Sequence, residues 1–320
     1  MKKYFSIILI SFIFSSLLNA QVSLQKKHKP AFYIELNSSY NNETRNYYLI
    51  ETTGNTNSLL EWKSNYLFKE GIAGGIAIRN LEINLYTQFS LPFECGKMYD
   101  SDWRTVGIKT NYSTSDLFTA LGNDTKFSLK YNFQLGEESN NFFVSPIVCI
   151  SNSFIKFNAK NTVGWCGDTG HTHLQQDYPW NSEVAKKVNK YGIDFTNNIT
   201  SILCGVGFEK QIGPFIVNTG ALISPFTYIL SIDHHLNKED GQYYQLIQKA
   251  LFKEWDFFGN FGYSINNNNT ILLCVDYNFC PVIPGDFYYG YFKIENIIAE
   301  QTSRFSFKKL SVTFIWKYSF

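Results

Sequence analysis

The sequence predicts an all-β fold: a transmembrane antiparallel β-barrel of about ten strands, with long strands that extend above the membrane. Three observations support this prediction: an alternating C-terminal segment, a high aromatic content and an N-terminal export signal. Aromatic residues make up 18% of the 320 residues and charged residues only 17%, against about 25% charged residues in an average soluble domain. A chain with so many aromatic residues and so few charges is not expected to be disordered. Its net charge of +1 gives no indication of nucleic-acid binding.

The N-terminus has the pattern of a secretory signal peptide. Two lysines precede an apolar run over residues 5–18, and Ala20 offers a small residue for cleavage. The run is too short to span a membrane, and no later stretch is long and apolar enough for a transmembrane helix. We therefore expect residues 1–20 to be the signal peptide and residues 21–320 to form the barrel as one domain.

The C-terminal segment, residues 310–320, alternates in polarity as a strand with two different faces does. One face is fully apolar, and the other is polar except at Ile315. The two sets are Leu310, Val312, Phe314, Trp316, Tyr318 and Phe320, and Ser311, Thr313, Lys317 and Ser319. In an outer-membrane barrel the apolar face contacts lipid and the polar face lines the lumen. A soluble β-sandwich would bury the apolar face, but the aromatic excess favours the barrel, whose membrane interfaces carry aromatic girdles.

Shorter alternating segments, separated by Gly, Asn, Asp or Pro, predict the remaining strands. In chain order they are 31–40, 46–53, 58–68, 72–79, 81–91, 126–135, 142–151, 153–160, 191–197, 200–210, 214–223, 226–232, 243–251, 255–264, 270–279 and 287–296. Some neighbouring segments are expected to be parts of one long strand, which brings the number to about ten. Closure of the sheet is expected because lipid does not tolerate an open sheet edge.

A pair of acidic residues, Asp100 and Asp102, follows the strand predicted to end near Phe93. Residues i and i+2 of an extended chain point the same way, so the two carboxylates share a face. Placing like charges together is costly unless a proton, a cation or a donor lies between them. A functional site is one reason to accept that cost. Taken alone, the pair is better explained as a solvated acidic loop, because Asp-x-Asp is common.

A second pair, Asp233 and His235, follows the strand through Leu230 and also shares a face, while His234 points the other way. A carboxylate beside an imidazole fixes its tautomer and raises its basicity. Taken alone, this pair is better explained as an exposed histidine in a turn. Distant strands of a barrel can face each other across its mouth, however. The two pairs together then predict a cleft where three carboxylates and one imidazole activate a water.

At these residues the chain resembles the omptins, outer-membrane proteases of Gram-negative bacteria. Three segments carry the resemblance, in matching order and spacing: Leu60-Glu61-Trp62-Lys63, Gly96-Lys97-Met98-Tyr99-Asp100-Ser101-Asp102-Trp103 and Asp233-His234-His235. It implies a ten-stranded barrel and an endopeptidase that cleaves peptides or proteins outside the cell. His235 would be the general base and Asp233 would orient it. Asp100 and Asp102 would position the water and stabilise charge, with no acyl-enzyme, metal or cofactor.

The chain departs from the family where omptins bind a basic substrate side chain and lipopolysaccharide. Ser231 stands where the family can have an acid, and Glu43 is the nearest candidate for the second acid of the pocket. We take Glu43 and Ser231 as substrate-binding candidates without assigning a preference for basic residues. Lys156 lies near the position of a lipopolysaccharide-binding arginine that this chain lacks. Expected partners are therefore a peptide or protein substrate and outer-membrane lipid, with the chain a monomer and lipopolysaccharide dependence not assigned.

Several alternatives remain open at this stage. Asp168, His171 and His173, with Asp177, could bind a metal, although a polar extracellular loop explains them better. Six cysteines in an exported chain allow 15 pairings, and scattered apolar residues or an incidental bridge are the favoured interpretation. The barrel could also be a pore or an adhesin without catalysis, or a catalytically intact scaffold that binds host proteins.

Overall fold

The structure is a computed structural model. It describes residues 30–50, 54–136, 141–167, 177–189, 192–236, 242–291 and 298–320. The chain divides into Met1–Pro30 and Ala31–Phe320, and the fold described below is that of the second unit. The predicted signal peptide lies outside the described residues. No helix in the described part of the chain is long and apolar enough to cross a membrane.

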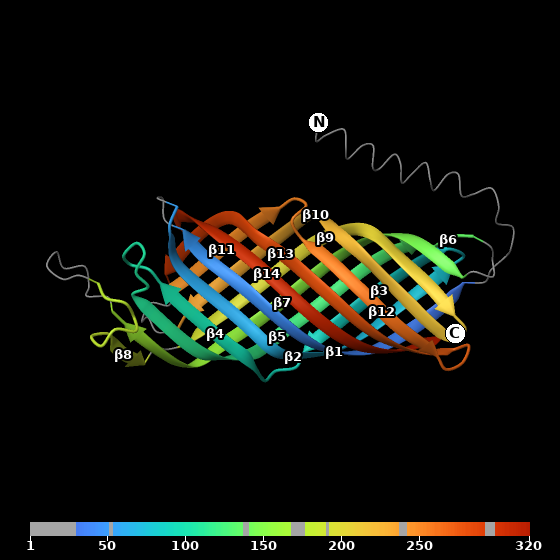
Figure 1. The fold of residues 1–320 in the computed structure, drawn as a ribbon, viewed down its shortest axis with the longest axis horizontal. Coiled ribbons are helices and arrows are strands. Elements are labelled where there is room, and N and C mark those ends of the chain that lie inside the picture. Colours follow the sequence, from blue (N-terminus) through green and yellow to red (C-terminus); the bar gives the residue numbers. More distant parts are fainter. Residues whose placement is uncertain are drawn as a thin grey trace, which may run out of the picture. The chain divides into compact units, whose positions relative to one another are not determined.

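The strands form one antiparallel sheet that closes on itself (Figure 1). They are β1 (Ala31–Ile50), β2 (Thr56–Ile78), β3 (Leu81–Ser90), β4 (Glu94–Asp102), β5 (Asn111–Tyr131), β6 (Phe133–Gln134), β7 (Phe142–Cys166), β8 (Lys186–Asn189), β9 (Ile193–Ile212), β10 (Phe215–His235), β11 (Gln242–Ala250), β12 (Trp255–Ser264), β13 (Asn269–Tyr291) and β14 (Ile298–Ser319). Pairing of β1 with β14 and of β5 with β7 closes the ring.

Ten positions around the ring account for these strands. β3 and β4 both pair with β2 and β5, so they share one position, and β11 and β12 share another between β10 and β13. The short β6 and β8 both pair with β7, β6 just beyond the end of β5 and β8 just before the start of β9. The predicted barrel of about ten strands is confirmed.

The barrel is apolar outside and polar inside, as the C-terminal segment predicted. On β14, Phe314 is 51% exposed and Thr313 is 4% exposed. The apolar outer side chains form a belt around the barrel. On β1 the belt runs from Phe32 to Tyr40, and its Tyr40 edge continues on β14 at Val312, the residue that pairs with Tyr40. The belt is interrupted by Glu70, whose carboxylate accepts a hydrogen bond from Ser38 at 2.7 Å. Lipid is the solvent that such an outer surface requires.

Several strands are far longer than the belt. β1 has 20 residues and β7 has 25, whereas about 9–11 residues cross a bilayer. The strands therefore continue beyond the belt, as predicted, at the end marked by β4, β8 and β11, on the left of Figure 1. We call this the cleft end. Its connections are long, while two-residue turns at the other end join β2 to β3 and β9 to β10. Gly213 opens the second of these turns with a φ of +58°, which favours glycine.

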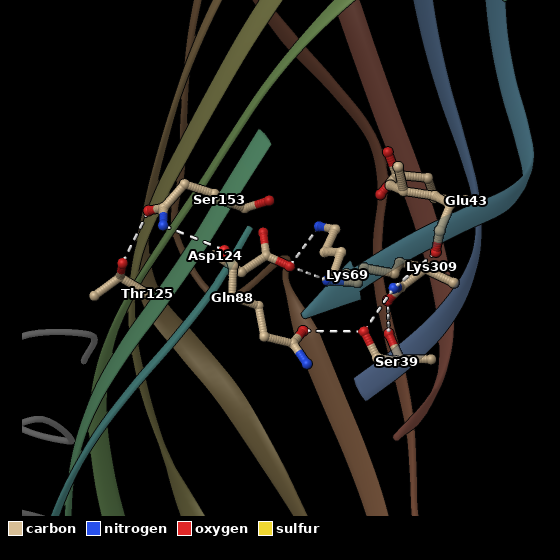
Figure 2. A network of polar contacts seen from close by, with 12 residues as sticks. Ser39, Glu43, Lys69, Gln88, Asp124, Thr125, Ser153 and Lys309 are labelled. Carbon is tan, nitrogen blue, oxygen red and sulfur yellow. Dashed lines mark hydrogen bonds and ion pairs between the residues drawn. The ribbon is translucent and has the colours of Figure 1, made fainter. Parts of the chain in front are cut away.

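Charged side chains fill the interior at the level of the belt. Asp124 of β5 lies between two lysines, with Oδ2 at 2.6 Å from Lys69 Nζ and 2.7 Å from Lys309 Nζ (Figure 2). Nearby, Arg45 pairs with Glu43 at 3.3 Å. These partners satisfy charges that would otherwise be expensive to bury. Of these residues, all but Lys69 line an interior cavity of about 270 Å³.

Three stacked rings, which we call the aromatic floor, lie above this cavity. Trp62 stacks on Phe195 with ring centroids 4.4 Å apart and on Phe157 at 6.3 Å. All three side chains are fully buried and belong to one apolar cluster. Along β1, Arg45 lines the cavity below the floor and Tyr47 lines the cleft above it. The floor thus divides the interior from the cleft end.

Some strand boundaries differ from the prediction. The segments 31–40 and 46–53 belong largely to one strand, β1, and 142–151 and 153–160 are both parts of β7. β4 and the first half of β5 were not predicted. No disulfide joins the cysteines of the described chain.

Candidate active site

Two strands bring the predicted acidic and histidine residues to the cleft end. β4 ends at Asp102 and β10 ends at His235. Inward-facing positions alternate along each strand, so Asp100 follows Met98 on the inner face, and Asp233 follows Ser231. Asp100 is 8% exposed and Asp233 is 1% exposed.

Strand register places the two pairs on different walls. On the first wall, Asp100 pairs with Leu60 of β2 and Ser113 of β5, and Leu60 pairs in turn with Tyr47 of β1. On the second wall, Asp233 of β10 pairs with Phe195 of β9 and Tyr244 of β11.

The aromatic floor joins these walls. Trp62 pairs with Met98, one inward position below Asp100, and its ring stacks on Phe195, the direct neighbour of Asp233. The stacked rings of Trp62 and Phe195, with centroids 4.4 Å apart, therefore connect the two walls beneath the two pairs. The acid pair and the Asp–His pair thus line one cleft from its two walls.

The cleft has a volume of about 250 Å³. All four predicted catalytic residues line it, together with aromatic, aliphatic and small polar side chains. The lining residues are Tyr47, Leu49, Asn57, Ser58, Leu60, Asp100, Asp102, Arg104, Asn111, Ser113, Thr162, Ile193, Asp233, His235 and Tyr244.

Asp233 and His235 are in hydrogen-bond contact, with Asp233 Oδ2 at 3.1 Å from His235 Nε2. With the carboxylate as acceptor, Nε2 carries the proton and Nδ1 carries the lone pair that a general base needs. The edge of the imidazole also meets Tyr244, at 5.0 Å between ring centroids and 69° between planes. These contacts fix the ring, and Asp233 can stabilise the imidazolium that forms when His235 takes a proton.

On the other wall, Ser113 Oγ donates to Asp100 Oδ2 at 3.5 Å. Tyr47 is 1% exposed. Burial, followed by the charges of Asp233, Tyr244 and Asp100, raises the pKa of Tyr47 well above its usual range. The influence of both carboxylates on one phenol agrees with their positions across the same cleft.

Glu43 and Ser231 do not line this cleft. Glu43 lines the interior cavity, is 2% exposed and is neutralised by Arg45. Ser231 is fully buried two residues below Asp233 and accepts a hydrogen bond from Asn197 Nδ2 at 2.8 Å. Both side chains point inward, but at a level beneath the catalytic candidates. The structure therefore does not bring them to the proposed site of cleavage.

Sequence reasoning missed Tyr47, Tyr244 and Arg104 as cleft residues. Tyr47 could have been found only from closure of the ring, and Tyr244 only from the register of β11 with β10. Of the alternative metal-binding residues, all but Asp177 lie outside the described residues. Asp177 accepts a hydrogen bond from Thr105 Oγ1 at 2.7 Å. In the described ranges no group of three or more His, Cys, Asp or Glu residues is arranged to hold a metal ion.

No protein-family model matches the chain, and no curated protein matches it. Among solved structures, the outer membrane protease OmpT from Escherichia coli is similar, with a TM-score of 0.77 and 16% identity over 93% of this chain and 99% of that chain. The translocator domain of autotransporter NalP from Neisseria meningitidis gives a TM-score of 0.32 at 9% identity, over 98% of this chain and 97% of that chain. A Pseudomonas aeruginosa FadL homologue gives 0.26 at 6% identity, over 91% and 90%. The first likeness shows the fold of an outer-membrane β-barrel.

Proposed function

We propose that this protein is an endopeptidase of the bacterial outer membrane that cleaves peptides or proteins at the cell surface with an activated water. The observation that carries the proposal is the cleft in which Asp100 and Asp102 face Asp233 and His235. The four residues were chosen from the sequence, by the spacing of the two pairs and the resemblance to the omptins, and their presence in one cleft is what an omptin-like site requires. The structural likeness to a protease supports the same assignment through the fold.

The proposed chemistry assigns each side chain one task. His235 accepts a proton from the water as its oxygen attacks the scissile carbonyl, and later gives that proton to the leaving amine. Asp233 holds the imidazole and stabilises its positive charge. Asp100 and Asp102 position the water from the opposite wall. Because water itself is the nucleophile, no acyl-enzyme forms.

The proposed location follows from the outer surface. The apolar belt fits a bilayer, and bacterial barrels have short turns on the periplasmic side and longer loops outside. The cleft end carries the long connections, so the site would open to the exterior. One chain closes the ring and builds the cleft, so a monomer suffices.

The test is a cleavage assay with the refolded barrel and a peptide library, read by mass spectrometry. We expect wild type to produce new termini, and Asp100→Ala, Asp102→Ala and His235→Ala to lose this activity. His234→Ala is the matched control, because His234 stacks on Tyr243 at 4.0 Å on the outer face and does not line the cleft. Absence of cleavage by wild type, or equal cleavage by wild type and the three cleft variants, would refute the proposal.

A further inference from the structure

The proposed reaction needs a hydrogen-bond donor that the four predicted residues do not supply. When water attacks a peptide carbonyl, negative charge develops on the carbonyl oxygen, and preorganised donors aimed at it give a large part of the rate. Ionised carboxylates only accept hydrogen bonds. His235 is occupied with the proton of the attacking water. The donor must therefore be a backbone N–H or another side chain of the cleft, and a side chain held in a fixed direction can be tested by substitution.

Most hydroxyl groups of the cleft already have a partner. Ser113 donates to Asp100, and Tyr244 donates to Gln242 Oε1 at 2.7 Å. Thr162 is hydrogen-bonded to Ser115 at 2.7 Å. The Tyr47 hydroxyl, in contrast, makes no hydrogen bond within the described chain, although its side chain is only 1% exposed.

The remaining polar candidates lie nearer the rim. Ser58 and Asn111 both pair with Asp102, one inward position above Asp100. Arg104 is exposed in the connection that follows β4. Tyr47 is at the level of Asp100, because both are neighbours of Leu60 in the sheet. It thus lies one inward position deeper in the cleft than Ser58, Asn111 and Asp102.

Tyr47 lines the same cleft as Asp100 and Asp233 and stays protonated. The charges of Asp233 and Asp100 both act on its hydroxyl, and with burial they keep its pKa well above its usual range. The phenol therefore retains its O–H. Its ring packs in the apolar cluster that contains Leu60 and Trp62, which fixes its direction.

We propose that the Tyr47 hydroxyl is a catalytic residue that donates a hydrogen bond to the oxyanion of the tetrahedral intermediate. This inference rests on the proposed peptidase function. The hydrogen bond is formed without proton transfer: the phenol keeps its proton while His235 carries the proton taken from water. The donor stands on the first wall, opposite the imidazole, so the carbonyl would be polarised on one side and attacked from the other.

The first test is the kinetics of Tyr47→Phe on a peptide that wild type cleaves. The variant keeps the ring and removes only the hydroxyl, so we expect kcat to fall about 10²- to 10³-fold, as for loss of one oxyanion donor, with KM nearly unchanged. Tyr48→Phe is the control, because Tyr48 is the next residue of β1 and does not line the cleft. An unchanged kcat, or a loss confined to KM, overturns the inference while leaving the peptidase intact. A wild type that cleaves nothing overturns both.

The second test asks whether Tyr47 donates to the oxyanion or acts through Asp233. The second role is considered because Asp233 Oδ1 is buried without a hydrogen-bond partner in the described chain. A phosphinic peptide mimics the tetrahedral intermediate. We expect Tyr47→Phe to weaken its binding about as much as kcat falls. Binding of the uncleaved amide peptide, measured with and without Tyr47→Phe in a His235→Ala background, should stay the same. If kcat falls but phosphinic peptide binding is unchanged, Tyr47 does not contact the oxyanion.

Discussion

At the scale of single residues, the site depends on which side of a strand each side chain occupies. His235 and His234 are adjacent in the chain, yet His235 contacts Asp233 inside the cleft and His234 stacks on Tyr243 outside. The same period of two separates Asp100 and Asp102 from Ser101. A shift of one residue in register would therefore place His234, in place of the proposed general base His235, inside the cleft.

Beneath the site, the ion pair of Arg45 and Glu43 predicts how much stability is lost when one buried charge loses its partner. Arg45 and Glu43 are 3% and 2% exposed, and Arg45 also donates to Asn197. Arg45→Met leaves Glu43 buried without this partner, so we expect the free energy of unfolding to fall by roughly 3–5 kcal/mol. Denaturant unfolding in detergent measures this change.

The control is the double variant Arg45→Met with Glu43→Gln, which removes both charges. We expect it to recover much of the lost stability, because no unpaired charge remains. A double variant as unstable as the sum of the two single variants would contradict a buried, mutually compensating pair.

The four proposed catalytic residues could be selected from sequence because their spacing defines a shared face. Glu43 and Ser231 show the limit of that reasoning. Both face inward as the pattern requires, but both lie below the aromatic floor. The position of a side chain along the barrel axis depends on the register between neighbouring strands, such as β10 with β9. The sequence of a single strand does not determine that register.

At the scale of the strand, residues 310–319 of β14 were predictable because the belt gives them one apolar and one polar face, whereas residues 298–309 were not predicted. The first half of β5 was not predicted. Its first six residues, Asn111 to Asp116, lie beyond the belt, where both faces can be polar and no alternation remains. Within β1, the outward Asn42 and Thr44 interrupted the apolar face and made one strand resemble two. Sequence thus predicts the lipid-facing parts of strands best.

The lipid-facing role of β14 predicts the effect of a charge on its outer face. We expect Phe314→Arg to destabilise the barrel in lipid vesicles by about 2–4 kcal/mol, the cost of a cation near the bilayer midplane. The matched control is Thr44→Arg on β1, because the outer face of β1 at Thr44 lies beyond the belt. We expect this variant to lose only about 0–1 kcal/mol of its free energy of unfolding. Equal losses in the two variants, measured by denaturant unfolding, would place the membrane elsewhere.

For the whole molecule, the side chains inside the barrel give an expectation that separates the proposed peptidase from a pore. Lys69, Asp124 and Lys309 cross the lumen at the level of the belt, and the aromatic floor lies between them and the cleft. We expect no stable conductance steps in planar bilayers. Steady ion-conducting steps from the wild-type barrel would favour the pore.

Cell binding that survives His235→Ala would instead favour the scaffold that binds host proteins.

The central claim is that residues on two distant strands, β4 and β10, act as one catalytic site. The most direct test is a double-mutant cycle on kcat/KM with Asp100→Asn and His235→Gln. Groups that act as a unit are strongly non-additive. We therefore predict that the double variant loses about as much activity as the more damaging single variant. A double variant whose loss equals the product of the two single losses would contradict the claim, as would a wild type without activity.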